Sequence, residues 1–193
     1  MTIKIILASS SPYRKELLKR LHLAFMTEPP DIEEQQKAGE SVPDMVLRLA
    51  EEKARHIAKI YPEALIIGSD QAAECSGTVL GKPGNREIAK EQLAFISNKS
   101  LVFHTGLCVL NSETGKMESA VIDYSVTFRD LTEAEIDRYL DKEQPFNCAG
   151  SFKSEKFGIS LVERMEGDDP TALIGLPLIR LCQMLRNQGI SLP

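Results

Sequence analysis

The chain contains no tryptophan, three histidines and four cysteines, and each shortage excludes a class of site. The histidines are scattered and form no H-E-x-x-H motif, so a zinc site is not expected. The cysteines, at positions 75, 108, 148 and 182, form no C-x-x-C pair. Since nothing else in the sequence indicates secretion, this spacing predicts buried, reduced thiols and not disulfides.

Long apolar runs and an excess of basic residues are also missing. No apolar run approaches the length that spans a membrane, and the N-terminus enters a predicted strand without a basic leader. The net charge of −5 argues against nucleic acid as a partner, because that requires a basic face. We therefore expect a cytoplasmic protein without membrane or nucleic-acid partners. A polyanionic ligand would need a local cluster of Lys and Arg, together with a metal ion.

The glycine motifs of common nucleotide-binding sites do not occur. The segment from Gly77 to Lys82 is one residue too short for a P-loop, and Pro83 stands where the loop needs a hydroxyl for Mg²⁺. There is no G-x-G-x-x-G and no G-x-S-x-G. Because histidine clusters are missing as well, any metal would be a hard cation bound by oxygen, Mg²⁺ or Mn²⁺.

What the sequence does contain is an alternation of strand-like and helix-like segments. A chain of 193 residues is long enough for one domain with a proper core, which could have two lobes. The order of elements predicts a mixed sheet with helices on its faces. The predicted strands are 3–8, 64–67, 101–110, 120–128, 148–152 and 158–162, and the predicted helices are 12–21, 41–61, 86–96, a short helix after Thr132 and a terminal helix from 176–177 to about 189.

Polar residues follow two of the predicted strands at their C-terminal ends. Asp70 and Gln71 come after the run 64–67, and the segment Ser9-Ser10-Ser11-Pro12-Tyr13-Arg14 follows the first strand. In α/β sheets this is the edge where ligands bind. The serines and the N–H groups of a helix N-terminus, with the forked cation of Arg14, form a phosphate site, although Ser11 is better explained as the N-cap.

Lys53 falls on an apolar helical stripe that also contains Val46, Ala50 and Ile57. An ammonium that faces a core must be paired or must reach a ligand, because burying it alone is costly. Two interpretations stay open at this point. Lys53 either binds a ligand, or it snorkels or forms an internal bridge to a residue such as Glu34.

Ordinary roles are also open to three other polar residues. Asp70 could be a turn-forming aspartate after a strand, which is common. Glu34 and Lys82, taken alone, fit a solvated loop carboxylate and a solvated surface lysine. Context is needed to decide between these roles and a binding site.

That context comes from seven short motifs that occur in order. They are Ser9-Ser10-Ser11-Pro12-Tyr13-Arg14, Ile32-Glu33-Glu34, Glu52-Lys53-Ala54, Gly68-Ser69-Asp70-Gln71, Gly81-Lys82-Pro83, Thr105-Gly106 and Gly150-Ser151-Phe152-Lys153-Ser154-Glu155. Together they resemble the Maf family of nucleoside triphosphate pyrophosphatases over essentially the full chain. The resemblance implies a single Maf-type nucleotide pyrophosphatase domain over 1–193. Its fold would be α/β, with a mixed, twisted central sheet flanked by helices and two lobes around a nucleotide cleft, as in Maf and ITPase-like proteins.

The resemblance also implies a reaction and a set of residues. The reaction is hydrolysis between the α- and β-phosphates with a divalent cation, in a cytoplasmic protein that is often a homodimer. Asp70 is implied as the proton acceptor that activates water, and Glu34 with Asp70 as metal ligands. The implied phosphate-binding residues are Ser9, Ser10, Arg14, Lys53 and Lys82, and the implied base-selecting residues are Tyr13, Gln71 and Glu155.

Within the family, Asp70-Gln71 and the segment 150–155 look like the 7-methyl-GTP branch, whereas the dTTP/UTP branch typically has threonine after the aspartate. The methylated guanine is cationic, so it should stack on the ring of Tyr13 and favour the carboxylate of Glu155. Two positions depart from the pattern. This branch typically has tryptophan at position 13, and Glu33 stands where the family usually has aspartate, so either Glu33 or Glu34 could bind the metal.

The expected function is therefore a 7-methyl-GTP pyrophosphatase. The alternative within the enzyme class is a dTTP/UTP or broad-specificity nucleotide pyrophosphatase. The non-enzymatic alternative is a nucleotide-binding regulator of cell division. That role predicts ligand binding that survives the substitution Asp70→Asn.

Overall fold

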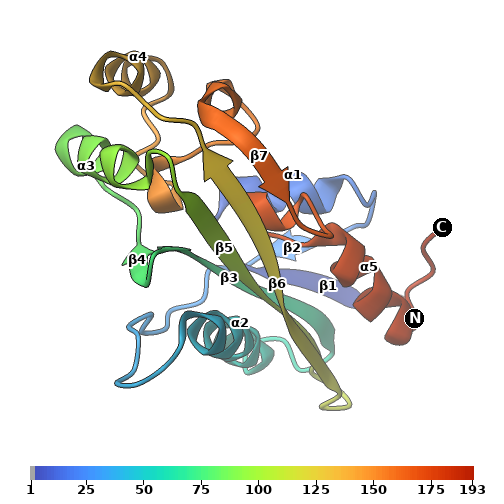
Figure 1. Cartoon of the computed structure of the whole chain (residues 1–193). Coiled ribbons are helices and arrows are strands. Elements are labelled where there is room, and N and C mark those ends of the chain that lie inside the picture. Colours follow the sequence, from blue (N-terminus) through green and yellow to red (C-terminus); the bar gives the residue numbers. More distant parts are fainter. Residues whose placement is uncertain (1–2) are drawn as a thin grey trace. The chain divides into compact units, whose positions relative to one another are not determined.

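The computed structural model describes residues 3–193, so residues 1 and 2 of the predicted domain lie outside it (Figure 1). Its strands form one mixed sheet in the order β2-β1-β3-β5-β6-β7, with β4 beside β3. The strands are β1 Lys4–Ala8, β2 Met26–Thr27, β3 Ala64–Cys75, β4 Thr78–Leu80, β5 Ser100–Asn111, β6 Met117–Phe128 and β7 Val162–Glu166. The helices are α1 Pro12–Lys19, α2 Val42–Ala58, α3 Arg86–Ile96, α4 Glu133–Glu143 and α5 Leu178–Asn187.

Strand directions confirm the predicted α/β class with a mixed sheet. β1 is parallel to both β2 and β3, whereas β4 is antiparallel to β3 and β7 is antiparallel to β6. The chain divides into two compact units. Unit 1 comprises residues 1–70, 105–122 and 169–193, of which 3–70 are described in the first segment, and unit 2 comprises 71–104 and 123–168.

Unit 1 has apolar side chains on both faces of its sheet. Because successive residues of a strand point to opposite faces, Ile5 and Leu7 of β1 lie on one face and Ile6 and Ala8 on the other. The first face packs against α1 and α5. The second packs against α2, which Figure 1 shows on the other side of the strands. The continuous apolar runs of β1 and of residues 64–67 in β3 follow from this coverage of both faces.

Two glycines let α2 lie directly against the sheet. A Cβ at Gly68 in β3 would lie 2.1 Å from the backbone oxygen of Ala50 in α2. A Cβ at Gly106 in β5 would lie 2.1 Å from the backbone oxygen of Val46. Only glycine permits so close an approach of two backbones. This contact fixes the height of α2 over the sheet and therefore the position of Lys53, almost one turn beyond Ala50.

Unit 2 contains α3, α4, β4, β7 and the remaining parts of β3, β5 and β6. Its core includes Phe152, whose ring lies 6.2 Å from that of Phe103 and 5.1 Å, edge to face, from that of Phe128. The buried Tyr139 hydroxyl donates to the backbone oxygen of Ser151 and accepts from the backbone N–H of Lys153. These bonds hold the segment 150–156 against α4.

Several predicted boundaries are wrong. β3 extends to Cys75, because β4 pairs with Ala73–Cys75, so Asp70 and Gln71 lie inside a strand and not after it. The segments 149–151 and 157–161 are 3₁₀ turns, and a strand begins only at Val162. Positive φ at Gly150 (63°) and Ser151 (57°) is incompatible with the strand predicted at 148–152.

Other boundaries are confirmed or nearly so. The helix 86–96, the hairpin of β5 and β6 and the short helix after Thr132 are confirmed, and Thr132 forms a capping box with Glu135. The first two helices end at Lys19 and Ala58, two or three residues early, and the terminal helix runs from Leu178 to Asn187. Over residues 3–193, no helix combines the length and apolar character needed to cross a bilayer.

Candidate functional site

Lys53 joins two carboxylates in unit 1. Its Nζ lies 2.6 Å from Oδ1 of Asp70 and 2.7 Å from Oε1 of Glu34. The exposed fraction of the side chain is 6% for Lys53, 12% for Asp70 and 55% for Glu34. The internal bridge that the helical stripe left open is therefore present, and it includes Asp70 as well as Glu34. The two carboxylates offset the free-energy cost of burying the ammonium group.

Arg14 supplies a second cation to the same group. Burial lowers the pKa of its guanidinium, and the negative charges of Asp70 and Glu34 act in the opposite direction and raise it. The two carboxylates thus favour the charged form of the guanidinium. Its Nε donates to the backbone oxygen of Gly175 at 2.8 Å. Over residues 3–193, no hydrogen bond is made by Nη1 or Nη2, so the outer edge of the fork is open to a ligand such as phosphate.

The turn before α1 is built as an N-terminal cap. Oγ of Ser11 accepts from the N–H of Arg14 at 3.4 Å, which confirms Ser11 as the N-cap, and Pro12 follows at the first helical position. Ser9 is buried, and its Oγ accepts from the N–H of Ser11 at 3.1 Å. Ser10 is exposed. Ser9 thus shapes the turn, whereas Ser10 faces solvent.

Four predicted residues have other surroundings. Tyr13 is partly exposed on α1. Gln71 follows Asp70 within β3, so the two side chains point to opposite faces. Lys82, in the loop after β4, and Glu155, in the turn before residues 157–161, are both exposed in unit 2. Unit 1 thus brings Arg14, Glu34, Lys53 and Asp70 into one charged group. The roles of all the predicted site residues stay predictions.

Two features beside the charged group were not predicted from the sequence. Ser69 is fully buried, and its Oγ donates to Gly175 O at 2.9 Å, the same oxygen that Arg14 contacts. The turn before the terminal helix, for which the sequence predicted no role, carries this oxygen on Gly175. A polar residue inside the apolar strand 64–69 was the available signal for Ser69, because a buried hydroxyl needs a partner.

Two carboxylates are the available metal ligands. Over residues 3–193, no group of three His, Cys, Asp or Glu side chains is arranged to hold a metal ion. Glu34 and Asp70 converge on one point, and such a pair suits Mg²⁺, which usually takes one or two protein carboxylates and completes its shell with phosphates and water. Glu33 is exposed and forms no ion pair within the described residues, which favours Glu34 over Glu33.

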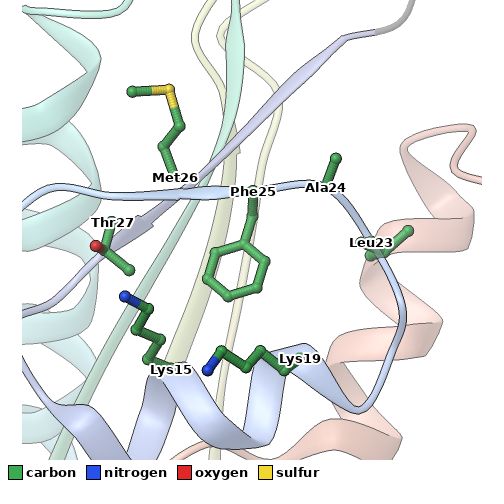
Figure 2. A pocket seen from close by; sticks show the side chains of 7 residues that line it. All are labelled: Lys15, Lys19, Leu23, Ala24, Phe25, Met26 and Thr27. Carbon is green, nitrogen blue, oxygen red and sulfur yellow. The ribbon is translucent and has the colours of Figure 1, made fainter.

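A pocket of about 500 Å³ lies elsewhere in unit 1, between α1 and the segment that leads to β2 (Figure 2). Its lining residues are Lys15, Lys19, Leu23, Ala24, Phe25, Met26 and Thr27. None of the predicted site residues lines it. One of its two ammonium groups, that of Lys19, is already paired with Glu16 at 2.6 Å. The charged group around Lys53 therefore stays the candidate site.

Comparison with known proteins agrees with the order of the motifs. The model of the family described as "Maf-like protein" matches residues 4–188. Three similar proteins, each named 7-methyl-GTP pyrophosphatase, come from Methylobacillus flagellatus, Pseudomonas syringae pv. tomato and Idiomarina loihiensis. Each is 52% identical to this chain, and the alignments cover 187, 189 and 193 residues in that order. They span 97%, 98% and 99% of this chain, and 97%, 98% and 98% of the respective relative. The chain belongs to the Maf family.

Proposed function

We propose that the protein hydrolyses 7-methyl-GTP between the α- and β-phosphates and releases 7-methyl-GMP and pyrophosphate. Two observations support the proposal. The similar proteins carry the name of this activity over nearly the full length of the chain. The observation that carries the chemistry is the buried group in which Lys53 holds Asp70 at 2.6 Å beside the open fork of Arg14.

In this proposal Asp70 is the general base. Lys53 binds Oδ1 and so orients the carboxylate. Over residues 3–193, Oδ2 makes no hydrogen bond, so this oxygen is available to accept a proton from the attacking water. A base placed in this way contributes about 10²–10⁴-fold to the rate.

The cationic side chains would position the phosphates and neutralise their charge. Phosphoryl transfer depends on positioning and on neutralising the charge of the phosphate oxygens more than on covalent help. Arg14 offers two free nitrogens on a fixed guanidinium, and the hydroxyl of Ser9 lies at the helix N-terminus beside it. These groups would grip the phosphates while Asp70 activates water.

A divalent cation completes the proposed site. Glu34 and Asp70 are the residues that would hold Mg²⁺ or Mn²⁺, shared with the phosphates of the substrate. When bound, such an ion polarises phosphoryl oxygens and stabilises their developing charge. Removal of the ion with EDTA should abolish activity, and added Mg²⁺ or Mn²⁺ should restore it.

Base selection is assigned to Tyr13, Gln71 and Glu155. A cationic 7-methylguanine favours an aromatic face and a carboxylate more than a neutral guanine does. Glu155 is exposed, and its Oε2 lies 3.5 Å from Oγ of Ser154. Its carboxylate is therefore accessible to a ligand.

Pyrophosphate release tests the proposal. The protein should be assayed with 7-methyl-GTP, GTP, dTTP and UTP, each with Mg²⁺ or Mn²⁺, and Asp70→Asn serves as the matched inactive variant. Faster turnover of dTTP or UTP would refute the base assignment and favour the alternative branch. Nucleotide binding without pyrophosphate release by the wild-type protein would refute the enzyme and favour the regulator of cell division.

Location and assembly belong to the same proposal. None of the four cysteines forms a disulfide, as predicted, but only Cys75 and Cys108 are buried, and Cys148 and Cys182 are partly exposed. Free thiols are compatible with a reducing compartment, so we propose a cytoplasmic location. A homodimer is proposed from the resemblance, and light scattering of the purified protein measures it.

A further inference from the structure

One backbone oxygen receives two side-chain donors beside the charged group. Gly175 O accepts from Nε of Arg14 at 2.8 Å and from Oγ of Ser69 at 2.9 Å. A carbonyl oxygen has two lone pairs, so both bonds form together. Arg14 comes from α1 and Ser69 from β3, and both residues belong to unit 1, as Gly175 does. The oxygen is therefore tied to the sheet by Ser69 while it holds the arginine.

The turn that carries this oxygen is itself fixed. Gly175 has φ of 107°, which residues with a side chain rarely adopt, and its N–H donates to Ala172 O at 2.9 Å. Asp169, only 3% exposed, accepts from the N–H of Thr171 at 3.0 Å and from its hydroxyl at 2.5 Å. The other oxygen of Asp169 accepts from the N–H of Ile179 at 2.7 Å, in the first turn of α5. Both ends of the turn are thus held by one carboxylate.

We propose that Ser69 and Asp169 are positioning residues that act through Arg14. They hold Gly175 O in place, this oxygen fixes Nε, and the guanidinium can then turn only its two η-nitrogens toward the phosphates. Ser69 is fully buried and Asp169 uses both oxygens on the backbone and on Thr171, so both residues are occupied within the fold. The inference rests on the proposed function, because it assigns phosphate as the ligand of Arg14.

A double-mutant cycle tests it. Ser69→Ala, Arg14→Ala and the double variant should be prepared in the full chain. The measurements are kcat/KM for pyrophosphate release from 7-methyl-GTP and the affinity for inorganic tripolyphosphate by calorimetry. We expect Ser69→Ala to lower both by about 5- to 10-fold when Arg14 is present, the size of one lost hydrogen bond between neutral groups. In the Arg14→Ala background it should change neither by more than about twofold.

A purely structural role gives a different pattern. If Ser69→Ala costs the same factor with and without Arg14, or costs nothing in either background, the positioning role is wrong. The matched control is Ser112→Ala, which removes a hydroxyl that donates to Tyr61 O at 2.6 Å and accepts from Ala64 N–H at 2.9 Å. This variant should lower stability and show no coupling to Arg14.

Asp169→Asn provides a second cycle if Ser69→Ala does not fold. It keeps the shape of the side chain but loses one acceptor, and it should show the same dependence on Arg14. The tripolyphosphate measurement separates this inference from the enzymatic proposal. A protein that releases no pyrophosphate from any nucleotide refutes the activity, and the binding cycle still decides the role of Ser69. A wild-type protein that does not bind tripolyphosphate overturns the inference.

Discussion

Lys53 and Asp70 of unit 1 differ in burial from Lys82 and Glu155 of unit 2. In unit 1, Lys53 and Asp70 are buried and bound to each other, and Arg14 is anchored on Gly175. In unit 2, Lys82 and Glu155 are exposed on loops. A buried charged side chain has a fixed orientation, but a substitution there also changes the stability of the fold. A charged side chain on a loop can be replaced without destabilising the core. We infer that the buried charges around Lys53 are more sensitive to substitution than the exposed charges of Lys82 and Glu155.

Four glycines near these two sets of charges show the same contrast. Gly68 and Gly106 of unit 1 lie against the backbone of α2 and leave no room for a Cβ. Gly81 and Gly84 of unit 2 have no atom within 4 Å of a Cβ built on them. Close backbone packing therefore supports the charged group of unit 1, and the loop that carries Lys82 has no such support. Substitutions at these two pairs of glycines should differ accordingly.

The largest effect is expected from Asp70→Asn. The amide has almost the same shape as the carboxylate, so it should leave the fold intact, but it is too weak a base to accept a proton from water. We expect kcat/KM for pyrophosphate release to fall by about 10²–10⁴-fold. The urea midpoint of each protein should be measured beside the assay. A variant that folds and keeps more than a tenth of the activity would remove Asp70 from the role of base.

Lys53→Met should have the next largest effect. Methionine fills the buried space of the stem but leaves Asp70 and Glu34 without their shared cation. We expect kcat/KM to fall by about 10- to 100-fold, as for the loss of a charged hydrogen bond. Lys15→Met is the control, since this exposed lysine lies on α1, outside the charged group, and its loss should leave the rate within about twofold. Equal effects of the two variants would contradict the special role of Lys53.

Gly68→Ala tests the close packing of α2. Its Cβ would lie 2.1 Å from Ala50 O, so the helix must move away from the sheet. We expect a loss of about 3 kcal/mol in the free energy of unfolding, and lower activity because Lys53 moves with the helix. Gly81→Ala is the matched control in unit 2, and it should change stability by less than about 0.5 kcal/mol. Urea denaturation measures both, and similar losses would contradict the contrast between the units.

The accuracy of the sequence-based predictions follows the same division. The core elements of unit 1 were predictable because their apolar periodicity is long and regular, and Lys53 stood out because it interrupts that periodicity. Its partner Glu34 lies 19 residues away, in a segment of irregular structure, so only one of two open interpretations named it. The bond from Ser69 to Gly175 joins residues 106 positions apart and leaves no local pattern.

In unit 2 the errors concern contacts that the local sequence does not encode. The extension of β3 past Asp70 depends on β4, a strand of three residues that sequence patterns do not resolve. The predicted strand at 148–152 failed because Ser151, which is not glycine, adopts a positive φ of 57°. Its hydroxyl bonds to Gln92 at 2.6 Å, a tertiary contact that stabilises the turn. The capping box at Thr132 was predictable because both of its partners lie within four residues.

Glu155→Gln should give a smaller effect, limited to selectivity. It removes a charge from an exposed turn, so the free energy of unfolding should stay within about 0.5 kcal/mol of wild type. A cationic 7-methylguanine loses more from this change than a neutral guanine. We expect the ratio of kcat/KM for 7-methyl-GTP over GTP to fall by about 5- to 10-fold. An unchanged ratio would remove Glu155 from base selection.

The smallest effect concerns the dependence of stability on pH, through Glu135 in the capping box of α4. The backbone N–H and the hydroxyl of Thr132 donate to its carboxylate at 2.9 and 2.8 Å, and Arg129 adds a third bond at 3.1 Å. These bonds, the backbone one first, lower the pKa of Glu135 from 4.5 to about 2. A carboxylate with a lowered pKa in the folded state stabilises the fold above pH 4.5, and this contribution is lost as the pH falls toward 2.

Glu135→Gln should therefore be less stable than wild type at pH 7, and the difference should shrink steadily between pH 4.5 and pH 2. Urea midpoints measured at several pH values test this. The matched control is Glu87→Gln, because Glu87 occupies the first turn of α3 and its side chain makes no hydrogen bond or ion pair within residues 3–193. Its difference from wild type is the baseline against which the change in Glu135→Gln is measured. If the two variants show the same pH dependence, the capping carboxylate of unit 2 is not held by its bonds, and the unit is more loosely ordered at this helix than unit 1 is around Lys53.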